Sequence, residues 1–420
     1  MTMGKFIWDK NLKVRLIGEG LFNLLFWMYF PFITVYFGEI LGFQIAGLLM
    51  ALPPLLSIIG SLIGGNFADS LGRRPVMLLG TFLQMLMFVM FALSTSPWID
   101  YIAFIGIGLG SALYRPASSA MVADLVPERN LRQVFAAFMT VNNIGAVLGP
   151  VIGAIFFFHY RQELLWTCAL VLFLYLLAIY FITYETLPNS KKELDLTSPL
   201  KHSFKERWNG YTIIFRDKIF MVYVVAGVFS LFPIMQLDLY LPVYIINNIP
   251  TQPLFTWNSN SLLLSSNEIY GWLVGLNGLL FVLFILPVTN WFKNWQERNI
   301  FILSSLLAGI GTFLVGINNN IWYLFFVTVI FTFGEIVRTP VTQSFVSHYA
   351  PEHARGQYLA ADSLQNTLGK AMAPLTVFLA SFTPPMGIFS LIVVFSIIGV
   401  LLYIKLFRMY SPKLKIMDED

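Results

Sequence analysis

The residues of this chain that could do chemistry are acids and bases placed inside long apolar stretches. Such positions are held by Glu19, Arg115, Asp238, Glu335, Arg338, Asp362 and Lys370. A charged group within membrane hydrocarbon costs several kcal/mol, so it normally faces a polar interior and serves the passage of ions or substrates. These side chains are therefore candidates for binding protons, cations or counter-ions.

Glu335 is the strongest candidate for a proton-binding site. It lies about 14 residues, or roughly 21 Å, into its apolar stretch, where low-dielectric surroundings disfavour a charged carboxylate. We expect such an acid to take up and release protons. Arg338 follows three residues later and can share a helix face with Glu335. A permanent ion pair between the two would instead make the site structural.

Asp238 and Asp362 are further candidates for proton coupling. Asp238 has no cation in its own apolar stretch. Asp362 and Lys370 share a helix face about two turns apart, which is too far for direct contact along one helix. Glu19 lies near one end of the first stretch, where it can pair with Arg15 or Arg115 instead of serving transport.

A substrate cavity needs groups that match its ligand. Amide side chains supply hydrogen bonds, and aromatic rings attract cations, although aromatic residues of membrane proteins more often serve packing and interfaces. The residues that we expect to line such a cavity are Glu19, Asn23, Trp27, Arg115, Asn142, Gln236, Arg338 and Gln343.

The composition places all these residues in a membrane protein. Hydrophobic residues make up 57% of the chain and charged residues 11%, and the mean hydropathy is +0.73. The core of a soluble protein does not need so many apolar residues. Twelve apolar stretches of about 20 residues start near residues 15, 43, 75, 100, 133, 163, 219, 267, 299, 321, 356 and 386. Their continuous apolar character predicts helices, because barrel strands alternate.

Lysine and arginine predict the orientation of these spans. Most of the 26 basic residues lie at both termini and in every second loop, which the positive-inside rule assigns to the cytoplasm. The net charge of +4 then indicates contact with the inner leaflet and no nucleic-acid partner. A single cysteine and four histidines exclude a disulfide framework and argue against a metal site.

The chain consists of two similar halves. Residues 110–150 recur at 334–374 without a gap, so that Gly110, Pro116 and Pro150 correspond to Gly334, Pro340 and Pro374. A repeat of this kind is typical of transporters whose site lies between the repeats. We expect one six-helix bundle over residues 1–187, a cytoplasmic linker with a surface helix over 188–218, and a second bundle over 219–420.

The loop between the second and third spans combines glycines with charge. Its residues are Gly65, Asp69, Gly72, Arg73 and Arg74. Glycine allows a tight turn, and the arginines can reach the acidic end of the fourth span at Asp124 or Glu128. Such a network can stabilise one conformation of two bundles that rock against each other. A merely polar turn would explain the arginines but not Asp69.

This loop resembles the signature G-x-L-A-D-R-x-G-R-K of the major facilitator superfamily, with Ser70 in place of the arginine. A second signature, G-x-x-x-G-P-x-x-G-G, is matched in the fifth span by Gly145, Gly149, Pro150 and Gly153, with Ala154 in place of the last glycine. In that superfamily it marks proton-coupled drug exporters, although small residues also simply permit close helix packing. Residues 185–188 are a weaker match to the same superfamily.

Residues 235–243 and 334–340 resemble the seventh and tenth spans of the LmrP-type multidrug exporters. The resemblance implies an all-α membrane protein with twelve transmembrane helices in two pseudo-symmetric six-helix bundles. It also implies that the first, fourth, seventh and tenth spans line a central cavity. Where that group carries an acid in its fifth span this chain has Phe138, and the equivalent position of the second half is Asp362.

These features predict a transporter and not an enzyme. The favoured hypothesis is proton-driven export of lipophilic, often cationic compounds by a monomer in a bacterial plasma membrane, with both termini in the cytoplasm. The proton is the coupling ion and no cofactor is expected, because no P-loop motif for ATP occurs in the sequence. The alternatives are a dedicated exporter of one metabolite, sugar or lipid, and a membrane sensor or scaffold that transports nothing.

Overall fold

A computed structural model describes residues 8–187, 216–257, 260–351 and 355–417 of the chain. The first six long helices are α1 (Lys10–Leu41), α2 (Phe43–Ser70), α3 (Arg73–Leu93), α4 (Pro97–Leu125), α5 (Glu128–His159) and α6 (Arg161–Ile182). The second half contains α9 (Lys218–Met235), η1 (Gln236–Asp238), α10 (Tyr240–Asn248), β1 (Gln252–Trp257), β2 (Asn260–Leu264), α11 (Ser266–Phe292), α12 (Glu297–Val315), α13 (Ile321–Tyr349), α14 (Arg355–Met372), α15 (Leu375–Leu379) and α16 (Pro385–Met417).

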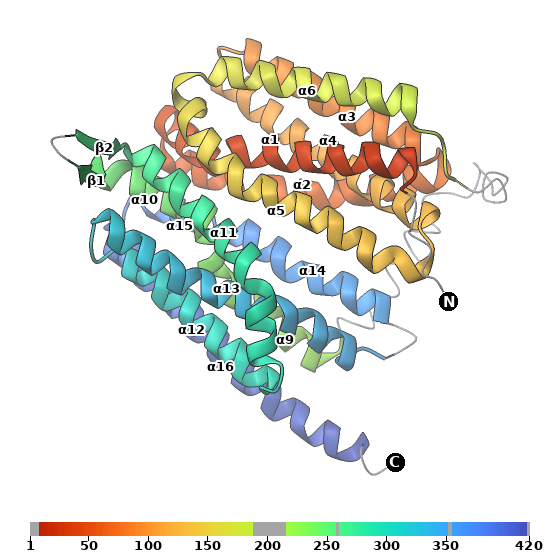
Figure 1. Cartoon of the computed structure of the whole chain (residues 1–420). Coiled ribbons are helices and arrows are strands. Elements are labelled where there is room, and N and C mark those ends of the chain that lie inside the picture. The colour runs from red at the N-terminus through yellow and green to blue at the C-terminus, as the bar shows by residue number, and fades with distance from the viewer. Residues whose placement is uncertain (1–7, 188–215, 258–259, 352–354, 418–420) are drawn as a thin grey trace. The chain divides into compact units, whose positions relative to one another are not determined.

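The helices form two compact units; Figure 1 colours the chain from red at the N-terminus to blue at the C-terminus. The first contains residues 1–33 and 52–198, and the second contains residues 34–51 and 199–420. Because residues 34–51 group with the second unit, the bundle boundaries at 187 and 219 stay a prediction. The expected surface helix of the linker falls within 188–215, outside the described residues.

In the first unit, α3 packs along both α4 and α6. The α3–α4 contact is close because Gly80 and Gly110 face each other's backbone, and a Cβ atom at Gly80 would lie 2.7 Å from the Gly110 carbonyl oxygen. Tyr114 of α4 and Tyr175 of α6 join their hydroxyl groups at 2.6 Å. These buried contacts set the register of the three helices.

The glycines of the fifth span bring α5 close to α1. A Cβ atom at Gly145 would lie 2.7 Å from the Leu24 nitrogen, and one at Gly149 would lie 2.5 Å from the Trp27 Cβ atom. Small residues at a helix interface let backbones approach in this way. The glycines of the second sequence signature therefore serve helix packing here. The role in proton-coupled export that the resemblance implies stays a prediction.

In the second unit, α9 packs along α12, α14 and α16, and α13 packs along α11 and α12. Its core is largely aromatic: the rings of Phe301 and Tyr403 stack with centroids 4.6 Å apart, and Tyr223 lies beside Phe301 and Phe345. All four side chains are buried. This cluster provides the rigid support on which the polar side chains of the unit are placed.

The seventh span is not a continuous helix. α9 ends at Met235, η1 covers Gln236–Asp238, and α10 starts after Leu239, whose φ of −120° and ψ of −71° interrupt the helical backbone. Pro233 contributes to the break because proline has no N–H for the helical ladder. Backbone that leaves the helix at membrane depth is typical of ion and substrate sites in transporters, and Asp238 lies at this break.

The antiparallel hairpin β1–β2 between α10 and α11 was not predicted from the sequence. Phe255 pairs with Leu262 and Thr256 with Ser261 in its register. The segment has too few residues to stand out against the long apolar stretches around it. Apart from this hairpin, the structured elements within the described ranges are helical.

The predicted fold class is confirmed. Each of the twelve predicted spans corresponds to a helix or to a pair of helix segments. In the described part of the chain, ten helical stretches are long and apolar enough to cross a membrane, and α4 and α14 are not among them. Both carry more small and polar residues, which suits helices that are shielded from lipid by their neighbours.

We expect Gly149→Ala to lower the melting temperature of the detergent-solubilised protein, by the equivalent of about 1–3 kcal/mol, because the added methyl group overlaps Trp27. Gly108→Ala on α4 is the matched control, since no atom lies within 4 Å of a Cβ atom there. Thermal unfolding followed by size-exclusion chromatography measures both. Equal melting temperatures for the two variants would contradict the close α1–α5 packing.

Candidate functional site

Glu335 of α13 is held by neutral groups. The Asn277 Nδ2 atom of α11 donates to its Oε2 atom at 3.0 Å and also to the Thr332 hydroxyl at 3.0 Å. The Glu335 side chain is half-buried, and the ion pairs within the described residues do not include it. Sequence reasoning missed Asn277, because an asparagine one helix away gives no spacing signal.

Arg338 points away from Glu335. Its guanidinium donates to Ser230 at 3.0 Å, to Tyr403 at 2.8 Å and to the Gln365 Oε1 atom at 2.9 Å. It also lies over the rings of Phe301 and Tyr403, with distances to the ring centroids of 5.4 and 5.6 Å. Only 3% of Arg338 is exposed. This buried cation is therefore satisfied by hydroxyl, amide and aromatic groups, and not by the acid in its own helix.

Asp362 of α14 belongs to the same polar network as Arg338. Tyr223 donates its hydroxyl to the Asp362 Oδ1 atom at 2.7 Å, and the Gln365 amide nitrogen donates to the same oxygen. Since the other end of the Gln365 amide accepts from Arg338, one amide connects the cation to the acid. Asp362 thus accepts hydrogen bonds from two side chains, whereas Glu335 accepts from one among the described residues.

Asp238 lies at the break in the seventh span with one oxygen unsatisfied. Within the described residues its buried Oδ1 atom has no hydrogen-bond partner. The charges of Lys370 and Glu335 both act on Asp238, and Tyr270 donates to the neighbouring Leu237 carbonyl at 2.9 Å. Glu335 of α13 and Lys370 of α14 are thus near enough to influence the charge of Asp238.

The other predicted cavity residues of the second unit differ in their surroundings. Gln236 is fully buried; its amide nitrogen donates to Phe232 and its amide oxygen accepts from Thr376. Those bonds leave it little capacity for a ligand in this conformation. Gln343 lies in α13, but its side chain is outside the described residues.

In the first unit, Arg15 and Glu19 of α1 form a loose ion pair at 3.8 Å. This is the pairing that the sequence offered for Glu19 in place of a role in transport. The Asn142 amide reaches Glu19 at 3.5 Å, and the Arg15 Nε atom donates to Ser118. The Arg15 guanidinium also lies 4.3 Å from the ring centroid of Phe138. An aromatic ring thus stands beside a buried cation at the position where LmrP-type exporters carry an acid.

The remaining cavity candidates of the first unit do not join this cluster through any hydrogen bond that the structure describes. Asn23 has a buried Oδ1 atom without a partner among the described residues, Trp27 packs against Gly149, and Arg115 is exposed on α4. Their part in binding a substrate stays a prediction.

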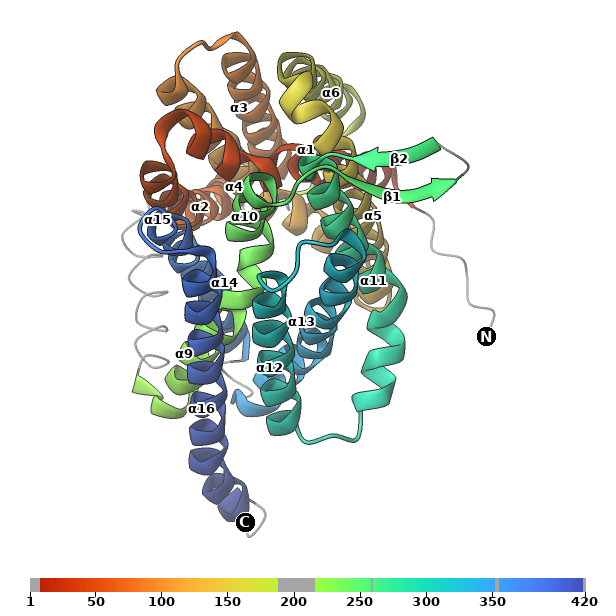
Figure 2. The ribbon, with the colours of Figure 1, turned by 90° about the vertical axis from the view of Figure 1, so that its left-hand side faces the viewer.

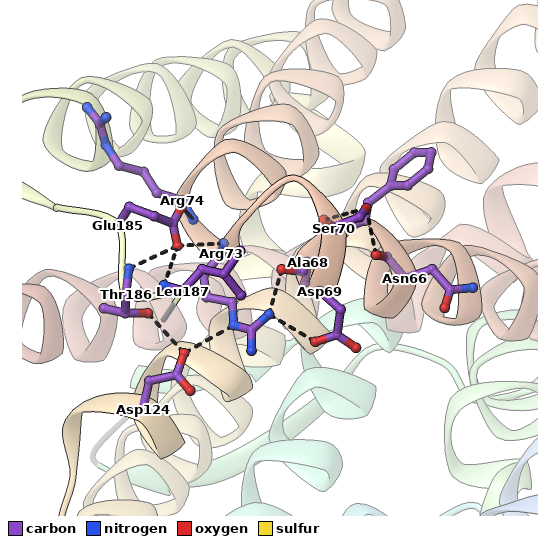
Figure 3. Close-up of polar contacts among 11 residues, drawn as sticks. Asn66, Ala68, Asp69, Ser70, Arg73, Arg74, Asp124, Glu185, Thr186 and Leu187 are labelled. Carbon is purple, nitrogen blue, oxygen red and sulfur yellow. Dashed lines mark hydrogen bonds and ion pairs between the residues drawn. The ribbon is translucent and has the colours of Figure 1, made fainter. Parts of the chain in front are cut away.

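The charged loop between α2 and α3 forms a clasp within the first unit, which Figure 3 shows. Arg73 donates to Asp124 at 3.1 Å, to Asp69 at 2.9 Å and to the Ala68 carbonyl at 2.5 Å. Arg74 turns instead to the Tyr180 carbonyl and ring. The Arg73 guanidinium is almost completely buried, so the clasp joins the ends of α2, α3 and α4 firmly.

Glu185 completes this clasp from the segment after α6 (Figure 3). Its carboxylate accepts from the backbone nitrogens of Arg73 at 2.9 Å and Arg74 at 3.1 Å, at the start of α3, where a helix favours negative charge. Gly72 has a φ of 109°, and a Cβ atom there would overlap the carboxylate. The sequence pointed to Glu185 only through the weak match at 185–188.

The pKa of Glu185 is lowered by these bonds. Burial by itself would raise the pKa of this carboxyl, but the backbone N–H groups of Leu187, Arg73, Arg74 and Thr186 stabilise its charged form and hold the pKa below its ordinary value of 4.5. The Glu185 carboxyl is therefore charged at neutral pH.

Long apolar helices, acids placed within them and an interrupted span are together the features of a membrane transporter. Residues 16–250 and 249–416 match the family model of the Major Facilitator Superfamily. The chain belongs to this superfamily; it is a multi-pass membrane transporter and not an enzyme.

Two curated relatives match over most of their length. The chain is 35% identical to a Na(+), Li(+), K(+)/H(+) antiporter of Planococcus maritimus, over 97% of this chain and 98% of that protein. It is 27% identical to the multidrug resistance protein MdtH of Cronobacter sakazakii, over 85% and 83% of the two chains.

Solved structures share the fold at low identity. A POT family transporter crystallised with 5-aminolevulinic acid superposes with a TM-score of 0.78 and 18% identity, covering 98% of both chains. The human organic anion transporter MFSD10 (TETRAN) superposes with a TM-score of 0.62 and 19% identity, covering 94% of this chain and 99% of that one.

We expect the Glu185 clasp to stabilise the protein at neutral pH and to weaken in acid. Because the folded pKa lies below 4.5, the stabilisation is complete above that pH and is lost as the pH falls through the lower folded value. Melting temperatures of the wild type and of Glu185→Gln, measured from neutral to acidic pH, should differ most at neutral pH and converge below 4.5. A difference that grows in acid would refute this assignment.

Proposed function

We propose that this transporter exchanges protons for cations across a bacterial plasma membrane by alternating access, with Glu335 and Asp238 as the acids that couple the two flows. The observation that supports this most is the neutral environment of Glu335. Its described hydrogen-bond partner is an amide, while the nearby Arg338 is bonded elsewhere.

A neutral partner lets Glu335 change its protonation state without breaking an ion pair. The Asn277 amide donates to one carboxyl oxygen, and it can keep that bond whether or not the other oxygen carries a proton. A carboxylate locked to a buried arginine would resist protonation, because removal of its charge would leave the cation unpaired. Glu335 is therefore suited to load and release a proton in every cycle.

Asp238 is suited to bind the exchanged cation. Its buried Oδ1 atom is unsatisfied among the described residues, and its electrostatic surroundings include Glu335 and Lys370. When Glu335 loses its proton, negative charge accumulates around Asp238 and attracts a cation; when the proton returns, that attraction falls. The proton and the cation thus compete for the negative charge of the two carboxylates, as antiport requires.

Asp362 contributes less to coupling in this proposal. Tyr223 and Gln365 already donate to it, and Arg338 balances it through the same amide. We assign it a secondary role in setting the electrostatics of α13 and α14, and we assign the clasp of Asp69, Arg73 and Asp124 the role of stabilising one conformation of the transport cycle.

The kind of cation is inferred from the relatives. The relative that is 35% identical is named for sodium, lithium and potassium, which favours alkali-metal ions. A second candidate function, the export of lipophilic cations, is favoured by the glycine and proline signature of the fifth span and by the weaker likeness to MdtH.

We expect Glu335→Gln to reduce cation-dependent proton movement in everted vesicles by about tenfold or more, because a glutamine amide cannot take up and release a proton. A factor of ten corresponds to roughly 1.4 kcal/mol. A pH-sensitive dye inside the vesicles reports the proton flux. Glu268→Gln is the matched control, because Glu268 caps α11 through Ser265 and is not expected to couple. Full activity of Glu335→Gln would exclude Glu335 from the coupling step.

The choice of cation is tested with Asp238→Asn and a panel of substrates. In the wild type, sodium, lithium or potassium should dissipate an imposed proton gradient, and Asp238→Asn should lose this response while its melting temperature is retained. A response of the wild type to lipophilic cations alone would support drug export instead. A response to a single metabolite alone would overturn both cation proposals.

A further inference from the structure

The hairpin β1–β2 carries apolar side chains that its own unit does not cover. Phe255 is 57% exposed and Leu262 is 46% exposed. Because these two residues are register partners on adjacent strands, their side chains share one face. The next pair, Thr256 with Ser261, lies on the opposite face and is also exposed. The two faces therefore differ in polarity at the outer end of the hairpin. Nearer the base, the Ser261 face also carries Leu263, which is 55% exposed.

The base of the hairpin is fixed at the first turn of a membrane-spanning helix. The Gln252 side chain donates to the Asn319 carbonyl at 2.6 Å and accepts from the Ile321 nitrogen at 3.0 Å, directly where α13 begins. The indole of Trp322 donates to the Leu254 carbonyl at 3.1 Å. Since α13 is a candidate span from Ile321 onward, these bonds set the hairpin at the depth of the membrane boundary.

The composition of the hairpin suits that depth. Residues 239–267 contain no lysine, arginine, aspartate or glutamate, so nothing in the segment requires full hydration of a charge. Trp322 is 58% exposed, and tryptophan at a helix end is typical of the layer between headgroups and acyl chains. Exposed apolar residues continue along the same helix at Phe326. An uncharged hairpin with exposed apolar residues, fixed beside such a helix end, is suited to the interfacial layer.

We propose that the Phe255–Leu262 face of the hairpin rests in the interfacial layer of the lipid bilayer, while the Thr256–Ser261 face contacts water. Figures 1 and 2 show the hairpin as an arm that projects from the ends of α10 and α11. With the orientation expected from the basic residues, this is the outer leaflet. The arm connects α10, which follows Asp238, to the start of α13, which carries Glu335, so lipid contact would stabilise both ends of the coupling site.

The pattern is tested by placing single cysteines on both faces. Cys168 is the native cysteine of the sequence and is fully buried, so its replacement by alanine gives a background for F255C, L262C, T256C and S261C. Each variant is labelled with a nitroxide, reconstituted in vesicles of phosphatidylethanolamine and phosphatidylglycerol, and measured for collision with oxygen and with a water-soluble nickel chelate. F326C serves as the lipid control and K293C, in the turn after α11, as the water control.

We expect positions 255 and 262 to be several-fold less accessible to the nickel chelate than positions 256 and 261, with oxygen collisions close to those at position 326. Equal nickel accessibility at all four positions would place the whole hairpin in water and overturn the proposal. Protection from both reagents at 255 and 262, together with crosslinking between two copies of F255C, would show that a second chain covers this face, and would also overturn it.

Discussion

The way in which Arg338 is satisfied determines what the second unit can do. A guanidinium buried among apolar helices needs acceptors for its N–H groups and aromatic rings against its flat face. Ser230, Tyr403, Gln365 and Phe301 provide these contacts. If Glu335 supplied them instead, the helix would carry a permanent ion pair. Because the arginine is satisfied elsewhere, the carboxyl group three residues away keeps a neutral partner, as the proposed proton exchange requires.

The second unit has three acids within apolar stretches, Glu335, Asp238 and Asp362, and these differ in their hydrogen-bond partners. Asp362 accepts bonds from Tyr223 and Gln365, and Glu335 accepts one bond from an amide. Asp238 has a buried oxygen that no described residue satisfies. The gradation follows from their positions. Asp362 faces the aromatic core of its unit, whereas Asp238 stands where the helical backbone is interrupted.

Much of the fold could be predicted from the sequence, because a membrane span needs a long apolar stretch and a repeat needs matching halves. The resemblance to the superfamily was also readable from short motifs, and the family match confirms it. The partners of the charged side chains were not predictable. Whether Arg338 turns toward Glu335 or toward Gln365 depends on the rotation of α13 against α9, α14 and α16, which spacing along one helix does not specify.

Contacts between distant elements escaped prediction for the same reason. Asn277 and Tyr223 reach their acids from other helices, and Glu185 reaches the start of α3 from a segment more than a hundred residues later. The hairpin was missed because its strands are short and adjoin strongly apolar helices.

The neighbour of Arg15 in the first unit has a consequence for how the protein responds to acidity. A benzene ring has no site for a proton, so the attraction between the Phe138 ring and the Arg15 guanidinium has the same strength in acid and in alkali. A carboxylate at that position would lose its ion pair with Arg15 each time it was protonated. The contact between Phe138 and Arg15 therefore does not respond to the proton gradient, whereas a contact with an acid would.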